Sequence, residues 1–175
     1  MCYNNLSMKI KHIYKMFDNV VGSEADIAAA VMEGKTFQDA FKFRPEQLQE
    51  FFVYGKELFY GGRYKEASDI FFFLIFLNPY LFETWTCFAL AEYNQGHYEF
   101  SDWAFQMAIT LHPLRGRTYL DFVQTLLERK EWDAARDVLD LMKMLLPNTS
   151  TEGAYHDAAL RMRKYIEGEK YAAQK

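Results

Sequence analysis

Apolar and small residues recur along the chain with a period of 34 residues. Three prolines close the successive periods, at Pro79, Pro113 and Pro147. Fifteen residues before each proline stands an aromatic side chain, twelve before it a small one, and eight before it a large apolar one. The residues in these positions are Tyr64, Ala67 and Phe71, then Tyr98, Ser101 and Phe105, then Trp132, Ala135 and Leu139. Repetition in phase over about 100 residues indicates a tandem array of short structural units.

Each period predicts two helices joined by a turn, with large residues on the facing sides and small residues where the helices cross closely. The expected helices are 48–60 and 64–77, 82–94 and 98–111, and 116–128 and 132–145. Glycine in the first two turns, at Gly61-Gly62 and Gly96, fits a helix end that enters the left-handed region, whereas the turn Arg129-Lys130-Glu131 has none. The pattern resembles that of tetratricopeptide repeats. The predicted fold class is therefore all-α, with three tandem helix–turn–helix repeats.

Helical segments are also expected before the array. An apolar stripe at spacings of three and four predicts an amphipathic helix, and a second short helix should run from Ser23 to about Glu33. The stripe consists of Leu6, Ile10, Ile13, Phe17 and Val20. The turn that follows should place three phenylalanines, Phe37, Phe41 and Phe43, over the open end of the core.

After the array, a second stripe predicts a helix that caps the last repeat. It consists of Tyr155, Ala158, Met162 and Tyr165. The polar residues from Glu167 onward are expected to fray. These assignments divide the chain into an N-terminal helical segment at 1–44, repeats at 45–147, and a capping helix with a polar tail at 150–175. The individual repeats should span about 48–81, 82–115 and 116–149.

Composition and charge exclude several classes of partner. Half of the 175 residues are apolar, which is enough for a core without disulfides or metal. A net charge of −4 gives no electrostatic reason to bind nucleic acid or an anionic membrane. The most apolar run, Ile70 to Leu77, is too short to cross a bilayer. With only two cysteines, Cys2 and Cys87, and no secretory signal, we expect a cytoplasmic protein.

No arrangement of residues in the sequence predicts an active site. The four histidines, His12, His97, His112 and His156, stand far apart, and none has a second His or Cys ligand within four residues. His97 and His112 should be solvated turn residues. Cys87 has no obvious basic neighbour, so a structural role is expected, and Gly61-Gly62 lacks the lysine of a phosphate-binding loop. We therefore expect no enzyme, no cofactor and no metal.

The abundant aromatic residues divide into a packing set and a surface set. The packing set is Tyr64, Phe71, Trp85, Tyr98, Phe105, Tyr119 and Trp132. The surface set follows from the repeat, because positions 2, 5, 9, 12 and 13 of each tetratricopeptide unit line the concave side of the first helices. The predicted groove residues are Phe52, Lys56, Phe59 and Tyr60, then Thr86, Leu90, Tyr93 and Asn94, then Leu120, Gln124, Leu127 and Glu128.

This predicted groove is apolar, with essentially one lysine, Lys56. Many repeats of this type carry several basic and amide side chains there and bind a terminal carboxylate. Aromatic and leucine side chains favour the apolar anchors of an extended peptide instead. The alternative is that the chain's own terminal segments cover part of the groove.

A more specific resemblance lies in the first repeat. The run from Leu48 to Ala67, the turn Leu77-Asn78-Pro79-Tyr80 and the lead-in Glu33-Gly34-Lys35-Thr36 resemble the translocator chaperones of bacterial type III secretion. The resemblance implies a non-enzymatic cytoplasmic chaperone that holds an extended apolar segment of a secreted client in the concave groove and keeps the client soluble before export. It also implies a homodimer formed through the N-terminal region.

Two stretches depart from that family. Cys87-Phe88-Ala89-Leu90 stands where a glycine-rich stretch is usual, and Phe122-Val123-Gln124 replaces a stretch similar to His-Ala-Ala-Glu. The client is thus left open between a pore-forming translocator, a gatekeeper and another secreted protein. The alternative function is a general tetratricopeptide adaptor that assembles two cellular proteins. An enzyme that uses the fold as a carrier has no residues to support it.

Overall fold

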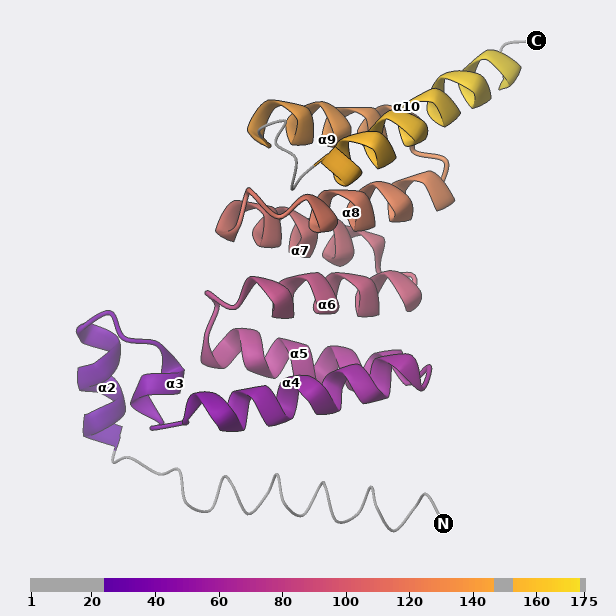
Figure 1. Ribbon diagram of the computed structural model, residues 1–175. Coiled ribbons are helices and arrows are strands. Elements are labelled where there is room, and N and C mark those ends of the chain that lie inside the picture. The colour runs from indigo at the N-terminus through magenta and orange to yellow at the C-terminus, as the bar shows by residue number, and fades with distance from the viewer. Residues whose placement is uncertain (1–23, 147–152, 174–175) are drawn as a thin grey trace.

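The computed structural model describes residues 24–146 and 153–173, and every regular element in these ranges is a helix. The helices are α2 (Glu24–Met32), α3 (Phe37–Ala40), α4 (Pro45–Tyr60), α5 (Tyr64–Leu77), α6 (Phe82–Asn94), α7 (Tyr98–Leu111), α8 (Gly116–Glu128), α9 (Trp132–Leu145) and α10 (Gly153–Ala173). Figure 1 shows α4 to α9 stacked as successive helix pairs, with α2 and α3 beside the first pair and α10 across the last. The predicted all-α repeat fold is confirmed.

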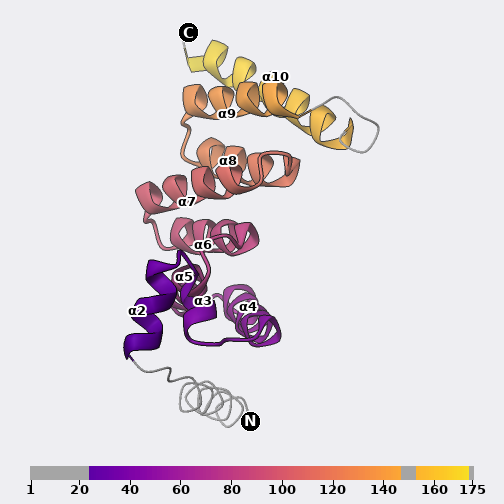
Figure 2. The ribbon, with the colours of Figure 1, turned by 90° about the vertical axis from the view of Figure 1, so that its left-hand side faces the viewer.

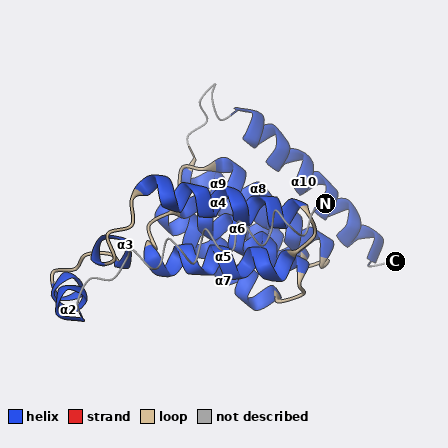
Figure 3. Ribbon diagram, turned by 90° about the horizontal axis from the view of Figure 1, so that it is seen from below, coloured by secondary structure: helices blue, strands red, loops and turns tan. Residues whose placement is uncertain are grey.

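The helices at the two ends of the described chain, α2 and α10, are not part of the repeated helix pairs. Figures 1 and 2 show α2 and α3 at the level of the first repeat, and along the axis of the stack the repeats overlap while α2 and α10 project from different sides (Figure 3). Of the elements described, α2 packs mainly on α3, and α10 packs on both α8 and α9. The predicted stripe Leu6, Ile10, Ile13, Phe17 and Val20 lies outside the described residues, as does Pro147.

Five of the six predicted repeat helices have the predicted bounds, and the differences lie at the ends of the array. Helix α4 begins at Pro45 rather than at residue 48. The Arg44 backbone is extended, its N–H donates to Gln47 Oε1 at 2.9 Å, and proline fits the first helical position because no N–H is needed there. The expectation of a frayed tail from Glu167 is wrong, since α10 continues to Ala173. Residues such as glutamate, lysine and alanine are good helix formers even without burial.

Small residues lie at the helix crossings, as their register predicts. Ala67, Ser101 and Ala135 are completely buried. At Gly55 a Cβ atom would lie 2.7 Å from Phe71 Cε1, so only glycine allows α4 to approach the ring this closely. The packing set is buried at Phe71, Trp85, Phe105 and Tyr119, and half-buried at Tyr64 and Trp132.

A repeated hydrogen bond explains why a proline and an aromatic residue share the register. The Trp85 indole Nε1 donates to the Pro79 carbonyl at 2.7 Å, and the Tyr119 hydroxyl donates to the Pro113 carbonyl at 2.8 Å. Each aromatic side chain is buried, and its polar end binds the loop that closes the preceding repeat. The first helix of the second and third repeats is therefore fixed to the loop before it.

The segment before α4 covers the open end of the core, as predicted. Thr36 caps the short helix α3, its hydroxyl accepting a hydrogen bond from the Asp39 N–H. Phe43 is buried and packs edge-on against Phe51, and Phe37 stacks on Phe76 of α5 with 4.5 Å between ring centroids. These contacts attach the N-terminal segment to the first repeat.

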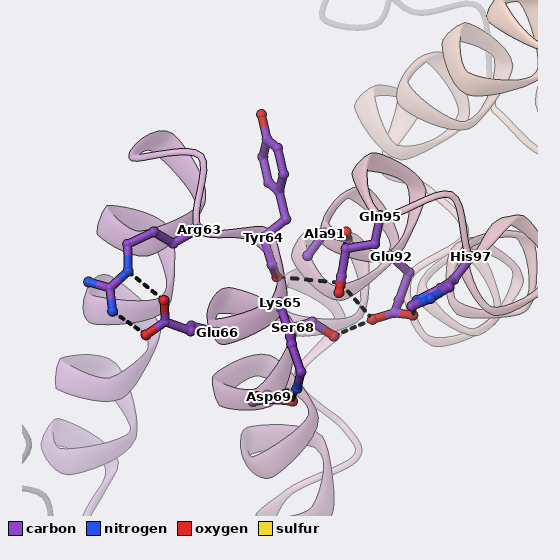
Figure 4. A network of polar contacts seen from close by, with 10 residues as sticks. All are labelled: Arg63, Tyr64, Lys65, Glu66, Ser68, Asp69, Ala91, Glu92, Gln95 and His97. Atoms are coloured by element: carbon purple, nitrogen blue, oxygen red, sulfur yellow. Dashed lines mark hydrogen bonds and ion pairs between the residues drawn. The ribbon is translucent and has the colours of Figure 1, made fainter.

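A polar network ties α5 to α6 at the first repeat junction (Figure 4). The Ser68 hydroxyl donates to the Glu92 carboxylate, the Gln95 amide donates to Glu92 Oε1 at 3.2 Å, and His97 Nδ1 lies 2.8 Å from Glu92 Oε2. Glu92 is only 7% exposed, so these partners compensate a buried charge. The prediction that His97 is merely a solvated turn residue is therefore incomplete.

The second junction carries a different network at the same repeat positions. Asp102 stands 34 residues after Ser68, and Arg129 stands 34 residues after Gln95. Arg129 Nη2 donates to both Asp102 carboxylate oxygens at 2.8 and 2.9 Å, and Nη1 lies 3.5 Å from Glu131 Oε1. The Arg129 guanidinium also lies 5.0 Å from the centre of the Tyr98 ring. Tyr98, predicted to pack in the core, is instead 44% exposed, with one face of its ring on this guanidinium.

The three turns within the repeats share one backbone conformation. Gly62 and Gly96 have φ values of 74° and 81°, and Lys130 occupies the same left-handed region with φ 62°. A side chain costs about 1–2 kcal/mol in this region, whereas glycine adopts it without strain.

Replacing Lys130 by glycine should therefore stabilise the protein by about 0.5–1 kcal/mol, after the greater freedom of glycine in the unfolded chain is counted. Urea denaturation followed by circular dichroism measures the change. Lys130→Ala is the control, because it removes the same charge and keeps the strain. Equal stability of the two variants would show that the left-handed backbone is not the cause.

Candidate functional site

The predicted groove residues lie on α4, α6 and α8, the first helices of the three repeats, and we call this surface the first-helix face. All of them are at least partly accessible to solvent: Tyr60, Asn94, Gln124 and Glu128 are exposed, and Phe52, Lys56, Phe59, Thr86, Leu90, Tyr93, Leu120 and Leu127 are half-buried. Tyr60, with 77% of its surface exposed, is the most accessible aromatic side chain among them. The face thus presents aromatic and leucine side chains from each repeat.

Hydrogen bonds join the second and third repeats across this face. The Tyr93 hydroxyl of α6 donates to Glu128 Oε2 of α8 at 2.6 Å, and the Gln124 amide donates to Glu128 Oε1 at 2.9 Å. Burial and the Glu128 carboxylate raise the pKa of Tyr93 to about 12, while the bonds from Tyr93 and Gln124 lower the pKa of Glu128. Glu128 is therefore a charged acceptor at neutral pH and Tyr93 a neutral donor.

Cys87 lies between charged residues of neighbouring repeats. Burial raises the pKa of its thiol to about 12; Lys56 of α4 lowers this pKa slightly, and Glu83 and Asp121 raise it slightly. A protonated, half-buried thiol is a poor nucleophile, which fits the predicted structural role. The cation that acts on this thiol, Lys56, is 31 residues away along the chain, so the sequence around Cys87 did not reveal it.

The sequence interpretation missed an ion pair on the same face. Arg117 Nε lies 2.8 Å from Asp121 Oδ1, one helical turn along α8. Asp121 is the main cause that raises the pKa of Arg117, and the hydroxyl groups of Tyr155 and Tyr60 also contribute. These tyrosines belong to α10 and α4.

The signal for Arg117 was present in the repeat. Arg117 occupies position 2 of its unit, the position of Gln49 and Glu83 in the first and second units. The groove residues named from the sequence came from the other four positions only. With Arg117, Asp121 and Glu83 included, the first-helix face is more polar than predicted.

A pocket of about 470 Å³ opens where α4 and α6 begin. Phe52, Leu48, Leu74, Leu81 and Phe82 form its apolar wall. Gln49 and Glu83, the position 2 residues of the first two units, stand among its polar lining residues. Pockets of this size with apolar walls and a few polar groups are typical of sites that receive a ligand side chain. Because Phe52 belongs to both, the pocket continues the first-helix face.

Within residues 24–146 and 153–173, no group of three or more His, Cys, Asp and Glu side chains is arranged to hold a metal ion. None of the helices in those ranges combines the length and the apolarity that a bilayer span requires.

No protein-family model and no curated protein sequence matches the chain. Solved structures do: a type III secretion complex from Aeromonas hydrophila aligns with a TM-score of 0.71 at 17% identity, over 84% of this chain and 98% of the other. The chaperone SycD of Yersinia enterocolitica, bound to a peptide of the translocator YopD, aligns with a TM-score of 0.63 at 17% identity, over 73% and 97%. The TPR2B domain of yeast Sti1, in a complex with Hsp70, aligns at 0.61 and 17%, over 70% and 97%.

The structural similarity establishes the fold. At identities of 17% it does not identify the client or the binding residues, which have to be inferred from the site. Two of these three structures are a type III secretion complex and a type III secretion chaperone bound to a translocator peptide. The chain has the tetratricopeptide-repeat fold that the type III secretion translocator chaperones also have, and the resemblance seen in its first repeat is confirmed at the level of that fold.

Proposed function

We propose that the chain is a type III secretion chaperone of the bacterial cytoplasm, which binds an extended apolar segment of a secreted protein along the first-helix face and keeps it competent for export. The observation that carries the proposal is the row of accessible aromatic and leucine side chains on α4, α6 and α8, which ends in the pocket beside Phe52. SycD, whose fold is similar, is bound to a peptide of a translocator. The client is a translocator or gatekeeper type of protein in this proposal, and no catalysis is involved.

The binding mode follows from what the face offers. An extended peptide exposes alternate side chains, so one apolar residue can enter the pocket at Phe52 while others contact Tyr60, Leu90 and Tyr93. Polar groups that remain accessible, such as the Gln124 amide and the Glu128 carboxylate, can bind the peptide backbone. Proline and leucine anchors suit such a surface because they contribute apolar area at little cost in conformational freedom.

A homodimer is part of the proposal. The apolar stripe Leu6, Ile10, Ile13, Phe17 and Val20 would form one side of a helix too short to be stable alone. It therefore needs a surface to pack against, on its own repeats or on a second subunit.

The second candidate, a general tetratricopeptide adaptor, is favoured by two observations. Lys56 and Arg117 both lie on the first-helix face, where a pair of cations could bind a terminal carboxylate. The Sti1 domain, similar in fold, belongs to a complex with Hsp70. Against this reading, Arg117 is already paired with Asp121, and Glu83 and Glu128 add negative charge to the face. The chaperone is therefore the better supported function.

Alanine substitution of the aromatic anchors separates binding from folding. Tyr60→Ala and Tyr93→Ala should each weaken binding of an extended peptide with spaced proline and leucine residues by about 1–3 kcal/mol, the range for interface aromatics that matter. Both variants should keep the helical spectrum and melt cooperatively, because neither side chain is fully buried. Isothermal titration and thermal melting measure the two effects.

The control is Phe100→Ala, which removes an exposed aromatic side chain from the second helix of the second repeat. It should bind the peptide as the unchanged protein does. Repeating the titration with the peptide's C-terminus amidated tests the adaptor, which would lose affinity. Normal binding by the tyrosine variants would rule out the proposed anchors.

A further inference from the structure

The second and third repeats leave a pocket between them on the side opposite the first-helix face. Its volume is about 510 Å³, and it is lined by residues of α7, α8 and α9. Phe122 and Leu126 of α8 lie at its base, about half a turn around that helix from Leu120 and Gln124 of the first-helix face. The two sites therefore share α8 and use different sides of it.

The same place at the first junction is occupied by aromatic side chains. The pocket residues Gln106, Thr110, Ala134 and Asp137 stand 34 residues after Phe72, Phe76, Phe100 and Trp103. Those four aromatic side chains are 47% to 60% exposed, and two of them pack on α6 between their helices, Phe72 on Phe88 and Trp103 on Trp85. At the second junction small and polar residues replace them, so the apolar surface below stays open.

The pocket combines an apolar wall with an acidic rim. Ile109, Val138 and Leu141 belong to the wall, together with Phe122 and Leu126. The rim carries three carboxylates, those of Asp102, Glu131 and Asp137. Arg129 pairs with the first two of these carboxylates and is itself 9% exposed, so its charge is directed inward. The rim therefore presents net negative charge beside apolar surface, which favours an amphipathic segment with positive charge.

The chain itself contains a segment of that chemistry. Residues 1–23 hold Lys9, Lys11 and Lys15 against a single acidic residue, Asp18. Lys9 follows Leu6 by three and precedes Ile13 by four, so in a helix it would stand at the edge of the apolar stripe. The stripe from Leu6 to Val20 covers about four helical turns, which matches the 14 residues of α7 and of α9.

The position of the N-terminal segment favours a second copy over the same chain. Glu24, where the described chain begins, lies in α2 beside the first repeat, whereas the pocket lies near the other end of the stack (Figure 1). A segment of the same chain would have to pass two repeats before its stripe could reach α7 and α9. A second subunit has no such constraint.

We propose that the pocket between α7, α8 and α9 receives the basic amphipathic N-terminal segment of a second copy of the chain, with apolar residues of the stripe against Ile109, Val138 and Leu141 and Lys9 at the acidic rim. This inference rests on the homodimer in the proposed function and names the surface that accepts the segment. Client binding and dimerisation then use different sides of the repeats, so a dimer can bind client on both first-helix faces.

Sedimentation velocity of the full chain over a range of concentrations tests the inference. Asp137→Lys and Lys9→Glu should each raise the dimer dissociation constant by roughly threefold or more, the size of an accessible charge pair. Combining them should restore the original constant to within about twofold. Asp69→Lys, the same reversal on α5, is the control and should change nothing.

A second variant fills the pocket with residues that the chain already uses. Gln106→Phe with Ala134→Phe copies Phe72 and Phe100 of the first junction, so the fold should tolerate it. It should weaken the dimer by about tenfold or more because the stripe can no longer enter. Unchanged dimerisation in this variant, in Asp137→Lys or in Lys9→Glu overturns the inference, as does a full chain that is monomeric at every concentration.

Ile10→Asp with Ile13→Asp separates the inference from the proposal on which it rests. If this variant is monomeric while the pocket variants remain dimeric, the stripe forms the dimer on another surface and the pocket assignment is wrong. If the pocket variants lose the dimer and still bind the extended peptide as the unchanged chain does, the two-sided arrangement is supported. Failure of the unchanged chain to bind that peptide would count against the chaperone function alone.

Discussion

Replacing Phe71 by alanine should lower the free energy of unfolding by about 3–5 kcal/mol, the range for a fully buried phenylalanine. Phe71 is completely buried in α5, where its ring contacts the α-carbon side of Gly55 and packs against Phe52 with 5.9 Å between centroids. The cavity would open at the crossing of α4 and α5, and glycine cannot fill it. Urea denaturation of the full chain measures the loss.

The adjacent residue supplies the control. Phe72 is 57% exposed and touches the stack mainly through Phe88, so Phe72→Ala should cost about 1 kcal/mol or less. Equal losses from the two variants would mean that the assignment of α5 faces to core and surface is wrong.

Replacing Arg129 by alanine should also be costly, by about 3 kcal/mol, near the lower end for breaking a buried ion pair. The Arg129 side chain is 9% exposed and that of Asp102 is 27% exposed, so the carboxylate left behind is only partly able to recover solvation. The variant would also lose the contact with the Tyr98 ring and the ion pair with Glu131. Asp102→Ala in the same background should recover part of the loss, because it removes the stranded carboxylate.

The loss should depend on pH in a defined direction. Burial raises the pKa of Asp102, and Arg129 lowers it in part. Without Arg129 the folded-state pKa should rise further above its unfolded value, so the folded variant gains stability as pH falls and loses it as pH rises through that pKa. Denaturation of Arg129→Ala at pH 4 and pH 7 should thus show a smaller deficit at pH 4. A larger deficit at pH 4 would contradict the role assigned to this pair.

Much of the fold could be predicted because each position of the 34-residue unit occurs three times in the sequence, so that its preference for a residue type can be recognised. Five helices have their predicted bounds since glycine or proline marks most turns and small residues mark the crossings. The prediction failed at the C-terminal helix, which lies outside the repeated units and occurs once in the chain. The continuation of α10 to Ala173, through glutamate, lysine and alanine residues beyond the buried Ile166, belongs to a single terminal helix with no counterpart in the repeats.

The site was less predictable because it depends on contacts between repeats. The register placed Tyr93 and Glu128 on equivalent faces, but only the arrangement of α6 and α8 brings the hydroxyl to the carboxylate. The contact of Tyr98 with Arg129 likewise joins two repeats, and the residue equivalent to Arg129 in the unit before is a glutamine. Spacing within one unit therefore predicts which side chains of the first helices remain accessible, and not which of them are already paired.

Site-specific photocrosslinking tests the central claim most directly. A photoreactive phenylalanine at Leu90, in the middle of the first-helix face, would be introduced into the full chain in its native host, and the crosslinked peptide identified by mass spectrometry. The same residue at Phe100 on α7 is the control. The account predicts an internal, apolar segment of a secreted protein crosslinked from position 90 and not from position 100. A C-terminal segment of a protein that is not secreted, or the same partner captured equally from both positions, would contradict it.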